Sequence, residues 1–301
     1  MSHAIEIVEV GPRDGLQNEA RLVSTADKVE LILRCIAAGA RRIEVASFVN
    51  PRKVPQMADA EAVVALLGDV AGVTRIGLVL NLRGAERALS CGIDQLGAVV
   101  AASDAFGTRN QGQDSAQSVN EALRIIALAK AARRSAQVTI ATAFGCPFQG
   151  EIDPAHVVAM ARQLARAGPA EIALADTIGV AVPAAVTALV GAVRAAITPL
   201  PVRVHFHDTR NTAIANVWTA VEAGAATIDA ALGGLGGCPF APGAAGNVGT
   251  EDVAYMLQRS GIEIGLDLDR LLAASNWLAG VMGKSLPASL ARAGAFPAGQ
   301  A

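Results

Sequence analysis

Aromatic residues are scarce in this chain of 301 residues, and charged residues are few. Aromatic side chains make up 3% of the sequence and charged ones 17%, whereas hydrophobic residues reach 52%. The chain can therefore bury a large core of Ala, Val, Ile and Leu, and its composition argues against general disorder. A net charge of −2 with no long basic run provides no electrostatic basis for binding nucleic acid.

Cysteine is rare as well, and the four cysteines form no CxxC pair. In a chain of this size, scattered cysteines predict reduced thiols, and we expect a cytoplasmic protein. The first ten residues lack the basic region and the long apolar region of a signal peptide. The cysteines are Cys35, Cys91, Cys146 and Cys238.

A long membrane-spanning run is also missing, although the mean hydropathy is +0.40. The longest uncharged stretch, residues 177–193, is short for a span and is interrupted by one proline and two glycines. We interpret it as the end of a buried strand followed by a helix, and we predict no membrane partner.

Short apolar segments alternate with helical patterns along the whole chain, which is typical of an α/β fold. Several helical patterns end at a glycine suited to the position after a helix, namely Gly39, Gly92, Gly168 and Gly224. The predicted strands are Ile5–Val10, Arg42–Ala46, Arg75–Leu80, Gln95–Ala101, Val138–Ala143, Glu171–Ala175, Val202–Phe206 and Thr227–Leu232. The predicted helices include Ala26–Ala38, Met57–Leu67, Asn120–Arg133, Pro154–Ala167, Pro183–Ala196 and Thr212–Ala223.

Eight strands alternating with helices over about 250 residues predict a (β/α)8 TIM barrel with extra C-terminal helices. We expect a single domain over residues 1–301, with the barrel at about 5–255 and the helical extension at about 256–301. A doubly wound sheet is the alternative fold, and a glycine fingerprint after the first strand would favour it. The sequence there is Gly-Pro-Arg-Asp-Gly and not GxGxxG.

A His-x-His pair ends the predicted seventh strand. Because residues i and i+2 of a strand point to the same face, His205 and His207 project together. Two histidines held by backbone carbonyls would be the structural alternative. With an aspartate from the end of another strand, they instead provide two imidazoles and a carboxylate for a divalent cation. Such a site fits Mg²⁺ or Mn²⁺, and ligand type alone also admits Zn²⁺.

Two further residues stand out, a charge inside an apolar strand and a thiol in a glycine-rich loop. Glu44 lies in a predicted barrel strand, and a structural ion pair with an arginine such as Arg13 is compatible with a functional role. Cys238 lies in a loop rich in glycine, and Cys146 is its rival because both occur in the tetrapeptide Gly-Cys-Pro-Phe. Loop mobility favours Cys238 as the functional thiol, whereas Cys35 and Cys91 are expected to serve packing.

These residues belong to longer stretches that resemble the hydroxymethylglutaryl-CoA lyases, a family of metal-dependent TIM-barrel enzymes related to isopropylmalate and homocitrate synthases. The resemblance covers about residues 5–280, and its most specific element is the cysteine loop GLGGCPF, which the synthases lack. The other matching stretches are VEVGPRDGLQNE (8–19), SFV (47–49), VPQMAD (54–59), DTIG (176–179), HFHDT (205–209) and the remainder of residues 234–252.

The resemblance implies roles for individual residues. It implies metal ligation by Asp14, His205, His207 and Asn247. It also implies that Arg13 contacts the thioester oxygen, that Glu44 is the essential glutamate and that Cys238 is the catalytic cysteine. In the expected reaction, His205 or Asp14 takes the proton of the substrate hydroxyl. Gln17 and Asn110 correspond to positions near the substrate or CoA.

The implied reaction is retro-Claisen cleavage of 3-hydroxy-3-methylglutaryl-CoA to acetyl-CoA and acetoacetate, assisted by Mg²⁺ or Mn²⁺. The same resemblance implies a place in leucine degradation and a homo-oligomer, either a dimer or a tetramer. Other readings are a lyase for citramalyl-CoA or a longer 3-alkylglutaryl-CoA, a Claisen synthase, and a non-catalytic acyl-CoA-binding protein.

One departure concerns the acyl group. The family pattern has Tyr-Gly-Gln after His-Asp-Thr, whereas this chain has Arg210-Asn211-Thr212. A structural role for Arg210 is one interpretation. The sharper hypothesis is that residues 210–212 reshape the acyl pocket, so that hydroxymethylglutaryl-CoA is not the best substrate.

Overall fold

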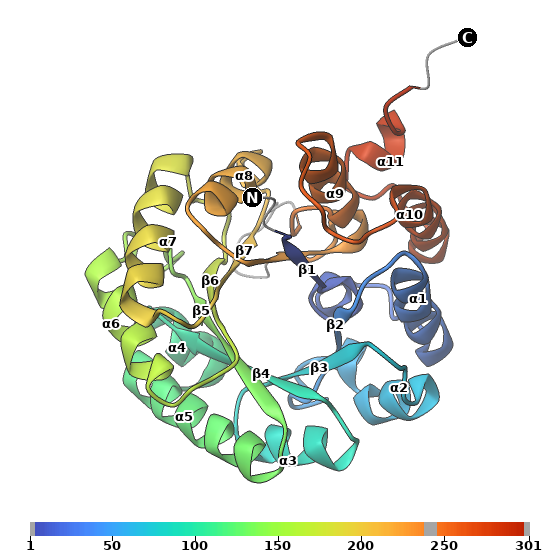
Figure 1. Ribbon diagram of the computed structural model, residues 1–301. Helices are drawn as coiled ribbons and strands as arrows, with labels where there is room; N and C mark the ends of the chain where they lie inside the picture. The colour runs from blue at the N-terminus through green and yellow to red at the C-terminus, as the bar shows by residue number, and fades with distance from the viewer. Residues whose placement is uncertain (1–3, 238–245, 298–301) are drawn as a thin grey trace.

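Eight parallel strands close into a barrel in the computed structural model, which describes residues 4–237 and 246–297. Each strand pairs with the next in sequence, and β1 pairs with β8 (Figure 1). The predicted TIM barrel is thereby confirmed. The strands are β1 (Glu6–Glu9), β2 (Arg42–Ser47), β3 (Thr74–Val79), β4 (Gln95–Ala101), β5 (Ser135–Ala141), β6 (Ile172–Asp176), β7 (Val202–Phe206) and β8 (Thr227–Ala230).

Helices surround the barrel and bury their apolar faces against its outer surface (Figure 1). The predicted glycine stops are confirmed, because Gly39, Gly92, Gly168 and Gly224 all have positive φ. The helices in the first half are α1 (Thr25–Ala37), α2 (Ala60–Leu67), α3 (Leu82–Ser90), α4 (Asp104–Gln111) and α5 (Ser115–Ala131). Those in the second half are α6 (Pro154–Ala165), α7 (Pro183–Ile197), α8 (Ala213–Glu222), α9 (Thr250–Arg259), α10 (Leu268–Met282) and α11 (Leu290–Ala293).

Several predicted boundaries are wrong. The helix predicted from Asn120 begins at Ser115, where the Asp114 side chain caps it, and the strand predicted from Val138 begins at Ser135. Two other boundaries are shifted by short 3-10 turns. The eighth strand ends at Ala230, because Leu232–Gly234 forms a 3-10 turn with Gly233 at positive φ. The second helix begins at Ala60, because Pro55–Met57 forms a separate 3-10 turn. The expected domain limits stay a prediction. The limit expected near residue 255 lies inside α9, and α10 packs on both α1 and α9.

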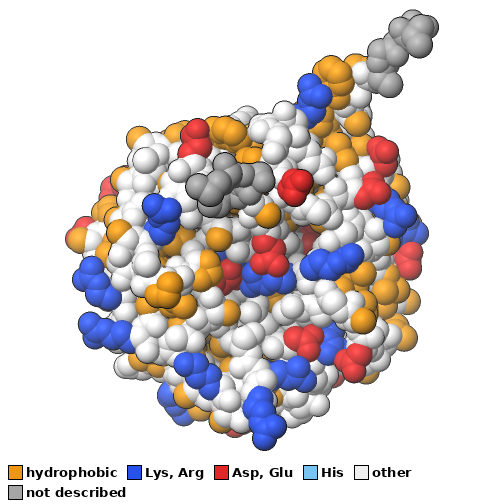
Figure 2. Space-filling model, in the orientation of Figure 1, with side chains coloured by type: hydrophobic (Ala, Val, Ile, Leu, Met, Phe, Trp, Pro, Cys, Tyr) orange, Lys and Arg blue, Asp and Glu red, His pale blue; other side chains and the backbone are white. Residues whose placement is uncertain are grey.

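The barrel interior holds charges near the end where the strands begin. Arg42 donates to Gln95 and Gln137 at 2.9 Å each and forms ion pairs with Glu6 and Glu171. Figure 2 shows acidic and basic side chains gathered over the barrel centre at this end of the molecule. Deeper inside, Arg203 is fully buried and pairs with Asp229 at 3.2 Å. Buried charges need such partners, and this network forms the floor beneath the opposite end of the barrel.

In the part of the chain that the structure describes, no helix is long and apolar enough to cross a membrane. The uncharged stretch at residues 177–193 instead covers a loop and most of α7, so the expected helix is confirmed, whereas the expected strand end is not part of it because β6 stops at Asp176.

Candidate active site

A cavity of about 1140 Å³ opens at the end of the barrel where the strands finish. This is the end at which TIM-barrel enzymes carry their catalytic residues. The cavity brings together most of the residues singled out in the sequence, although Asn247 lies just behind its wall. Cys238 lies outside the residues that the structure describes. The predicted site residues that line the cavity are Arg13, Asp14, Gln17, Glu44, Asn110, His205 and His207.

The loop after β1 presents Arg13 and Asp14 to the cavity. It forms a tight helical turn, Gly11–Gly15, with Pro12 at its start. Arg13 donates to Glu44 Oε2 through Nε at 2.8 Å and Nη2 at 2.5 Å, and to Asp14 Oδ1 through Nη1 at 2.6 Å. The ion pair expected between Glu44 and Arg13 is therefore present. An arginine has five N–H donors, so two of them stay free for a ligand.

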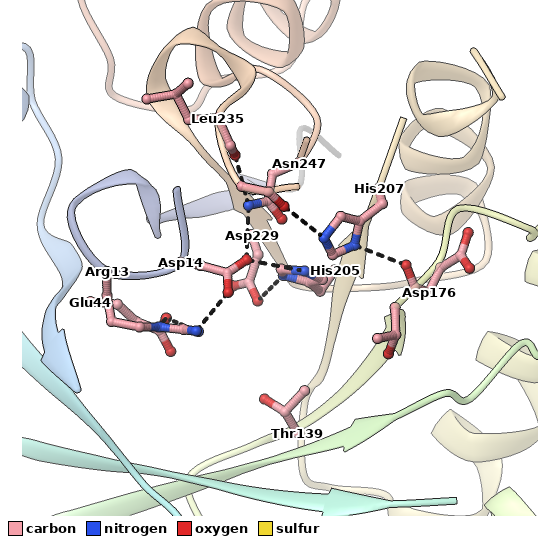
Figure 3. Close-up of polar contacts among 12 residues, drawn as sticks. Arg13, Asp14, Glu44, Thr139, Asp176, His205, His207, Asp229, Leu235 and Asn247 are labelled. Carbon is pink, nitrogen blue, oxygen red and sulfur yellow. Dashed lines mark hydrogen bonds and ion pairs between the residues drawn. The ribbon is translucent and has the colours of Figure 1, made fainter. Parts of the chain in front are cut away.

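His205 and His207 face Asp14 across the cavity (Figure 3). Ligand atoms of the three residues all lie within 4.8 Å of one another, and the two imidazole centroids are 5.0 Å apart. His205 Nε2 lies 3.7 Å from Asp14 Oδ2. Burial raises the pKa of Asp14, but Arg13, His205 and His207 outweigh it and lower the value to about 2. Asp14 is therefore an anion at neutral pH.

His207 is buried between two backbone carbonyls. Its Nδ1 lies 3.0 Å from the Asp176 carbonyl oxygen, and its Nε2 lies 3.2 Å from that of Gly236. Burial and the neighbouring His205 lower the pKa of His207 to about 4, so the ring is neutral at pH 7. A neutral imidazole has one N–H, which leaves the other nitrogen with a lone pair that a cation can use.

Asn247 offers an oxygen ligand beside the Asp14–His205–His207 cluster. Its Nδ2 donates to Asp14 Oδ2 at 2.8 Å and to the Leu235 carbonyl at 3.0 Å. Its Oδ1 is buried and has no hydrogen-bond partner among the described residues. Such an orphaned acceptor costs about 1–3 kcal/mol unless something satisfies it. A carboxylate, two imidazoles and this amide oxygen together fit a divalent cation.

Asp229 is a site residue that the sequence reasoning missed. It lies on β8 directly opposite His205 on β7, and its Oδ2 is 3.2 Å from His205 Nδ1 (Figure 3). Arg203 pairs with the other oxygen of Asp229 and also donates to Thr139 Oγ1 at 2.9 Å. A signal was available, because Asp229 is a charge in an apolar strand, as Glu44 is, and Arg203 lies two residues before His205.

Asp176 ends β6 but does not offer its side chain to the cluster. Its two carboxylate oxygens accept hydrogen bonds from the backbone N–H groups of Val180 and Ala181. Only its carbonyl oxygen faces His207. Of the aspartates at strand ends, Asp14 is therefore the one that joins the two histidines.

Arg210 does not line the cavity, which goes against the hypothesis that it reshapes the acyl pocket. Its Nη1 donates to the carbonyl oxygens of Ile178 and Gly179 at 2.9 and 2.8 Å. The side chain thus fixes the loop after β6, and the structural interpretation of this residue is the one that the contacts favour.

Three cysteines fall within the described residues and none lines the cavity. Cys35 is fully buried in the core. Cys91 follows the last residue of α3 and packs against the same core, so both serve packing, as expected. Cys146 is buried, with its Sγ 3.0 Å from Ser103 Oγ and accepting N–H groups of Phe148 and Gln149 at 3.4 Å.

Glu9 joins the loops after β1 and β8 beneath the site. Its Oε1 accepts N–H groups of Gly11 and Leu232 at 2.7 and 2.9 Å, and its Oε2 accepts the Thr250 hydroxyl at 2.7 Å. Burial raises the pKa of Glu9 from its ordinary value of 4.5 to about 7, although these hydrogen bonds oppose the rise. The folded protein therefore binds the Glu9 proton more tightly than the unfolded chain does.

Glu9→Gln should remove a pH dependence of stability. In the wild type, protonated Glu9 contributes to the free energy of unfolding. This contribution is complete below about pH 4.5 and is lost as the pH rises to about 7, which lowers the free energy of unfolding by about 3 kcal/mol. Glutamine can keep all three hydrogen bonds, because the Thr250 hydroxyl can turn to accept. Denaturant unfolding at pH 5, 6, 7 and 8 measures the difference. Parallel pH profiles for wild type and variant would contradict the assignment.

The chain is similar to known proteins along almost its whole length. The HMGL-like family model matches residues 4–278. An (R)-citramalyl-CoA lyase of Chloroflexus aurantiacus is 43% identical over 97% of this chain and 95% of its own length. A 3-hydroxy-3-isohexenylglutaryl-CoA/hydroxymethylglutaryl-CoA lyase of Pseudomonas aeruginosa is 40% identical over 96% of both chains. The solved structure of an HMG-CoA lyase from Acinetobacter baumannii in complex with coenzyme A and 3-methylmalate has a TM-score of 0.94, 39% identity and 99% coverage of both chains.

Proposed function

This chain belongs to the HMGL-like family, and from that premise we propose that it cleaves 3-hydroxy-3-methylglutaryl-CoA to acetyl-CoA and acetoacetate. The enzyme is a lyase of the hydroxymethylglutaryl-CoA type. The observation that carries the reaction is one cavity in which the Asp14–His205–His207 cluster adjoins an arginine with free donors. A retro-Claisen cleavage needs a stabilised alkoxide at one end of the breaking bond and a stabilised enolate at the other.

Asp14, His205, His207 and Asn247 would hold a divalent cation, and we propose Mg²⁺ or Mn²⁺ because oxygen and nitrogen ligands are mixed. When bound, such an ion lowers the pKa of the C3 hydroxyl. The orphaned Asn247 Oδ1 and the lone pair on one nitrogen of the neutral His207 ring support this ligand set. His205 is held by Asp229, which orients its ring toward Asp14.

Arg13 is proposed to stabilise the thioester enolate. As the C2–C3 bond breaks, its electron pair moves onto C2 and the thioester oxygen, where negative charge develops. Glu44 and Asp14 occupy three donors of the Arg13 guanidinium and fix its plane, and the two remaining N–H groups can donate to that oxygen. Removing one donor of this kind typically lowers the rate about 10²–10³-fold.

Two proton transfers complete the reaction. The C3 hydroxyl proton passes to His205 or Asp14, and the pKa of about 2 makes Asp14 the weaker base. The enolate then takes a proton at C2, and we propose that the Cys238 thiol donates it. Gln17 and Asn110 line the same cavity and are proposed to contact the acyl-CoA.

The proposal is tested by incubating the purified protein with Mg²⁺ and either hydroxymethylglutaryl-CoA or citramalyl-CoA. Acetyl-CoA with acetoacetate supports the main proposal. Acetyl-CoA with pyruvate alone supports the alternative, which the 43% identity to a citramalyl-CoA lyase favours. Cleavage of neither thioester would contradict lyase activity on both.

Arg210→Tyr should leave the preference between these two substrates within about twofold. The Arg210 guanidinium bonds to the carbonyls of Ile178 and Gly179 and does not reach the cavity. Loss of both bonds should instead lower stability by about 1–3 kcal/mol. The ratio of kcat/KM values in wild type and variant measures the first effect. A shift of tenfold or more would restore the hypothesis that residues 210–212 shape the acyl pocket.

Assembly as a dimer or tetramer, a cytoplasmic location and a place in leucine degradation stay predictions.

A further inference from the structure

A glycine lies inside the barrel between the active-site cavity and the charged floor. Alternate residues of a strand face the same side, and on β4 the inward-facing ones are Gln95, Gly97 and Val99. Gln95 belongs to the floor network around Arg42, whereas Val99 lines the active-site cavity. Bulky branched side chains usually fill the interior of a TIM barrel. Gly97 therefore leaves room at the level where the floor meets the active site.

Neither the backbone nor a steric clash requires glycine at position 97. Gly97 lies in regularly paired strand and has no positive φ. A Cβ atom added to it would lie 3.4 Å from Ile76 Cγ2, 3.5 Å from Gln137 Nε2 and 3.6 Å from Glu44 Oε1, which are ordinary contact distances. A glycine inside a strand weakens the strand, and it often marks a place where another group comes close to the backbone.

Gln137 directs a hydrogen-bond donor toward the space beside Gly97. Its side chain is fully buried, and its Oε1 accepts a hydrogen bond from Arg42 Nη2 at 2.9 Å. Because a guanidinium group can only donate, this contact fixes the orientation of the amide and leaves Nε2 to face Gly97. Nε2 is buried and has no hydrogen-bond partner among the described residues. Buried donors are normally paired, so this amide needs an acceptor.

Glu44 presents an acceptor to the same space. Arg13 donates to Glu44 Oε2 through both Nε and Nη2, so Oε1 keeps its lone pairs for another donor. No direct hydrogen bond joins Gln137 Nε2 to Glu44 Oε1, and one water molecule commonly bridges polar atoms that face each other in this way. Such a water accepts from the amide, donates to the carboxylate and can enter from the cavity that Glu44 lines.

We propose that one buried water molecule beside Gly97 joins Gln137 to Glu44, and that Gln137 is thereby a positioning residue for Arg13. The inference rests on the proposed lyase function. Both oxygens of the Glu44 carboxylate are then held, one by the Arg13 guanidinium and the other by the water. Through Arg42 and Gln137, the floor network fixes the arginine that stabilises the enolate, although it contacts no substrate atom.

Gly97→Ala should lower kcat about 10- to 100-fold, the range expected for one hydrogen bond to a charged group, and leave KM nearly constant. The added methyl group displaces the water without a clash, so the Glu44 carboxylate loses that bond. The variant should unfold at the same temperature as wild type or at a higher one, because alanine stabilises a strand relative to glycine. Loss of activity would then accompany unchanged or increased stability. A kcat within twofold of wild type would overturn the bridge.

Two further variants control for packing. Gly191→Ala makes the same atomic change in α7, where no atom lies within 4 Å of the added Cβ, and its kcat should equal that of wild type. Gly97→Ser is larger than Gly97→Ala, but its hydroxyl can accept from Gln137 and donate to Glu44 in place of the water. The serine variant should therefore be more active than the alanine variant. The opposite order would indicate crowding and overturn the bridge.

Gln137→Met removes the same bridge from its other side. Its kcat should fall as that of Gly97→Ala does, and the double variant should lose no more than either single variant, because residues that act through one contact are not additive. Losses that multiply would mean that Gly97 and Gln137 act independently, which contradicts a shared water.

Crystal structures of wild type and Gly97→Ala separate this proposal from the function. We expect electron density for a water molecule within hydrogen-bond distance of both Gln137 Nε2 and Glu44 Oε1 in wild type, and none there in the variant. If the water is present but wild type cleaves neither thioester, the bridge stands and the proposed lyase function fails. If wild type cleaves a thioester and holds no water at this position, the bridge is overturned and the lyase function stands.

Discussion

Exhaustive removal of divalent cations should lower turnover at least about 10³-fold, and Mg²⁺ or Mn²⁺ should restore it. The Asp14–His205–His207 cluster and the buried Asn247 Oδ1, which has no partner among the described residues, together offer four ligand atoms to a cation. A Lewis acid at the C3 hydroxyl lowers the activation free energy by several kcal/mol, and each 1.4 kcal/mol changes the rate about tenfold. The measurement is the steady-state rate after chelation and after titration with each metal. Full activity of the stripped protein would refute the metal assignment.

Metal affinity can be measured without turnover, from the signal of free Mn²⁺ in electron paramagnetic resonance. His207→Ala removes a proposed ligand and should weaken binding by more than about tenfold. Asp229→Asn should weaken it about 10- to 100-fold, because Asp229 orients His205 through Nδ1 and such supporting carboxylates tune the ligand that they hold.

Asp208→Asn is the control for both variants. Asp208 follows His207 directly, but its side chain accepts the Ala213 N–H at the start of α8, and asparagine can do the same. Its affinity for Mn²⁺ should equal that of wild type. If Asp229→Asn matched this control, Asp229 would have no part in positioning the metal ligand.

The barrel was predictable because its determinants are local. A strand such as Val202–Phe206 can be recognised from its length, its β-branched residues and the polar residues that follow it. Its bounds agree with the prediction. The alternation of side chains along a strand is equally local, so the two-residue spacing of His205 and His207 is enough to place them on one face. Their approach to Asp14 followed from the rule that strand ends of a barrel meet at one opening.

The partners of these residues were less predictable because they depend on register between distant strands. Asp229 contacts His205 because β7 and β8 pair with these two residues opposite each other, and no local pattern reports that alignment. The two interpretations of Arg210 could not be separated from the sequence for a related reason. Arg210 lies three residues after His207, yet the chain turns at Asp208–Asn211, with Asn211 at a φ of +55°, and directs Arg210 toward the loop after β6.

The two Gly-Cys-Pro-Phe tetrapeptides show where sequence spacing stops being informative. Residues 145–148 and 237–240 are identical in sequence, so their chemistry differs only through location. In the first of them, Cys146 is buried beside Ser103 and receives two backbone N–H groups, and it does not line the cavity. The structure therefore weakens Cys146 as the rival of Cys238, which lies outside the described residues.

Cys238→Ser should lower kcat about 10²–10⁴-fold, the range expected when a general acid is removed from a reaction. A serine hydroxyl is close to the thiol in size, but it is a far weaker acid than a thiol with a pKa near 8.5, so it cannot readily protonate the enolate carbon. Steady-state kinetics with saturating Mg²⁺ measure the loss. A thermal melt of each variant separates a chemical effect from misfolding.

Cys146→Ser is the matched comparison, since it makes the same atomic change in the same tetrapeptide. Its hydroxyl can still accept the N–H groups of Phe148 and Gln149 and contact Ser103, so kcat should stay within a fewfold of wild type. If Cys146→Ser lost activity while Cys238→Ser kept it, the proton donor would have to be reassigned to Cys146. Such an outcome would also require the loop after β5 to move, because the buried Cys146 thiol has no access to the cavity as it stands.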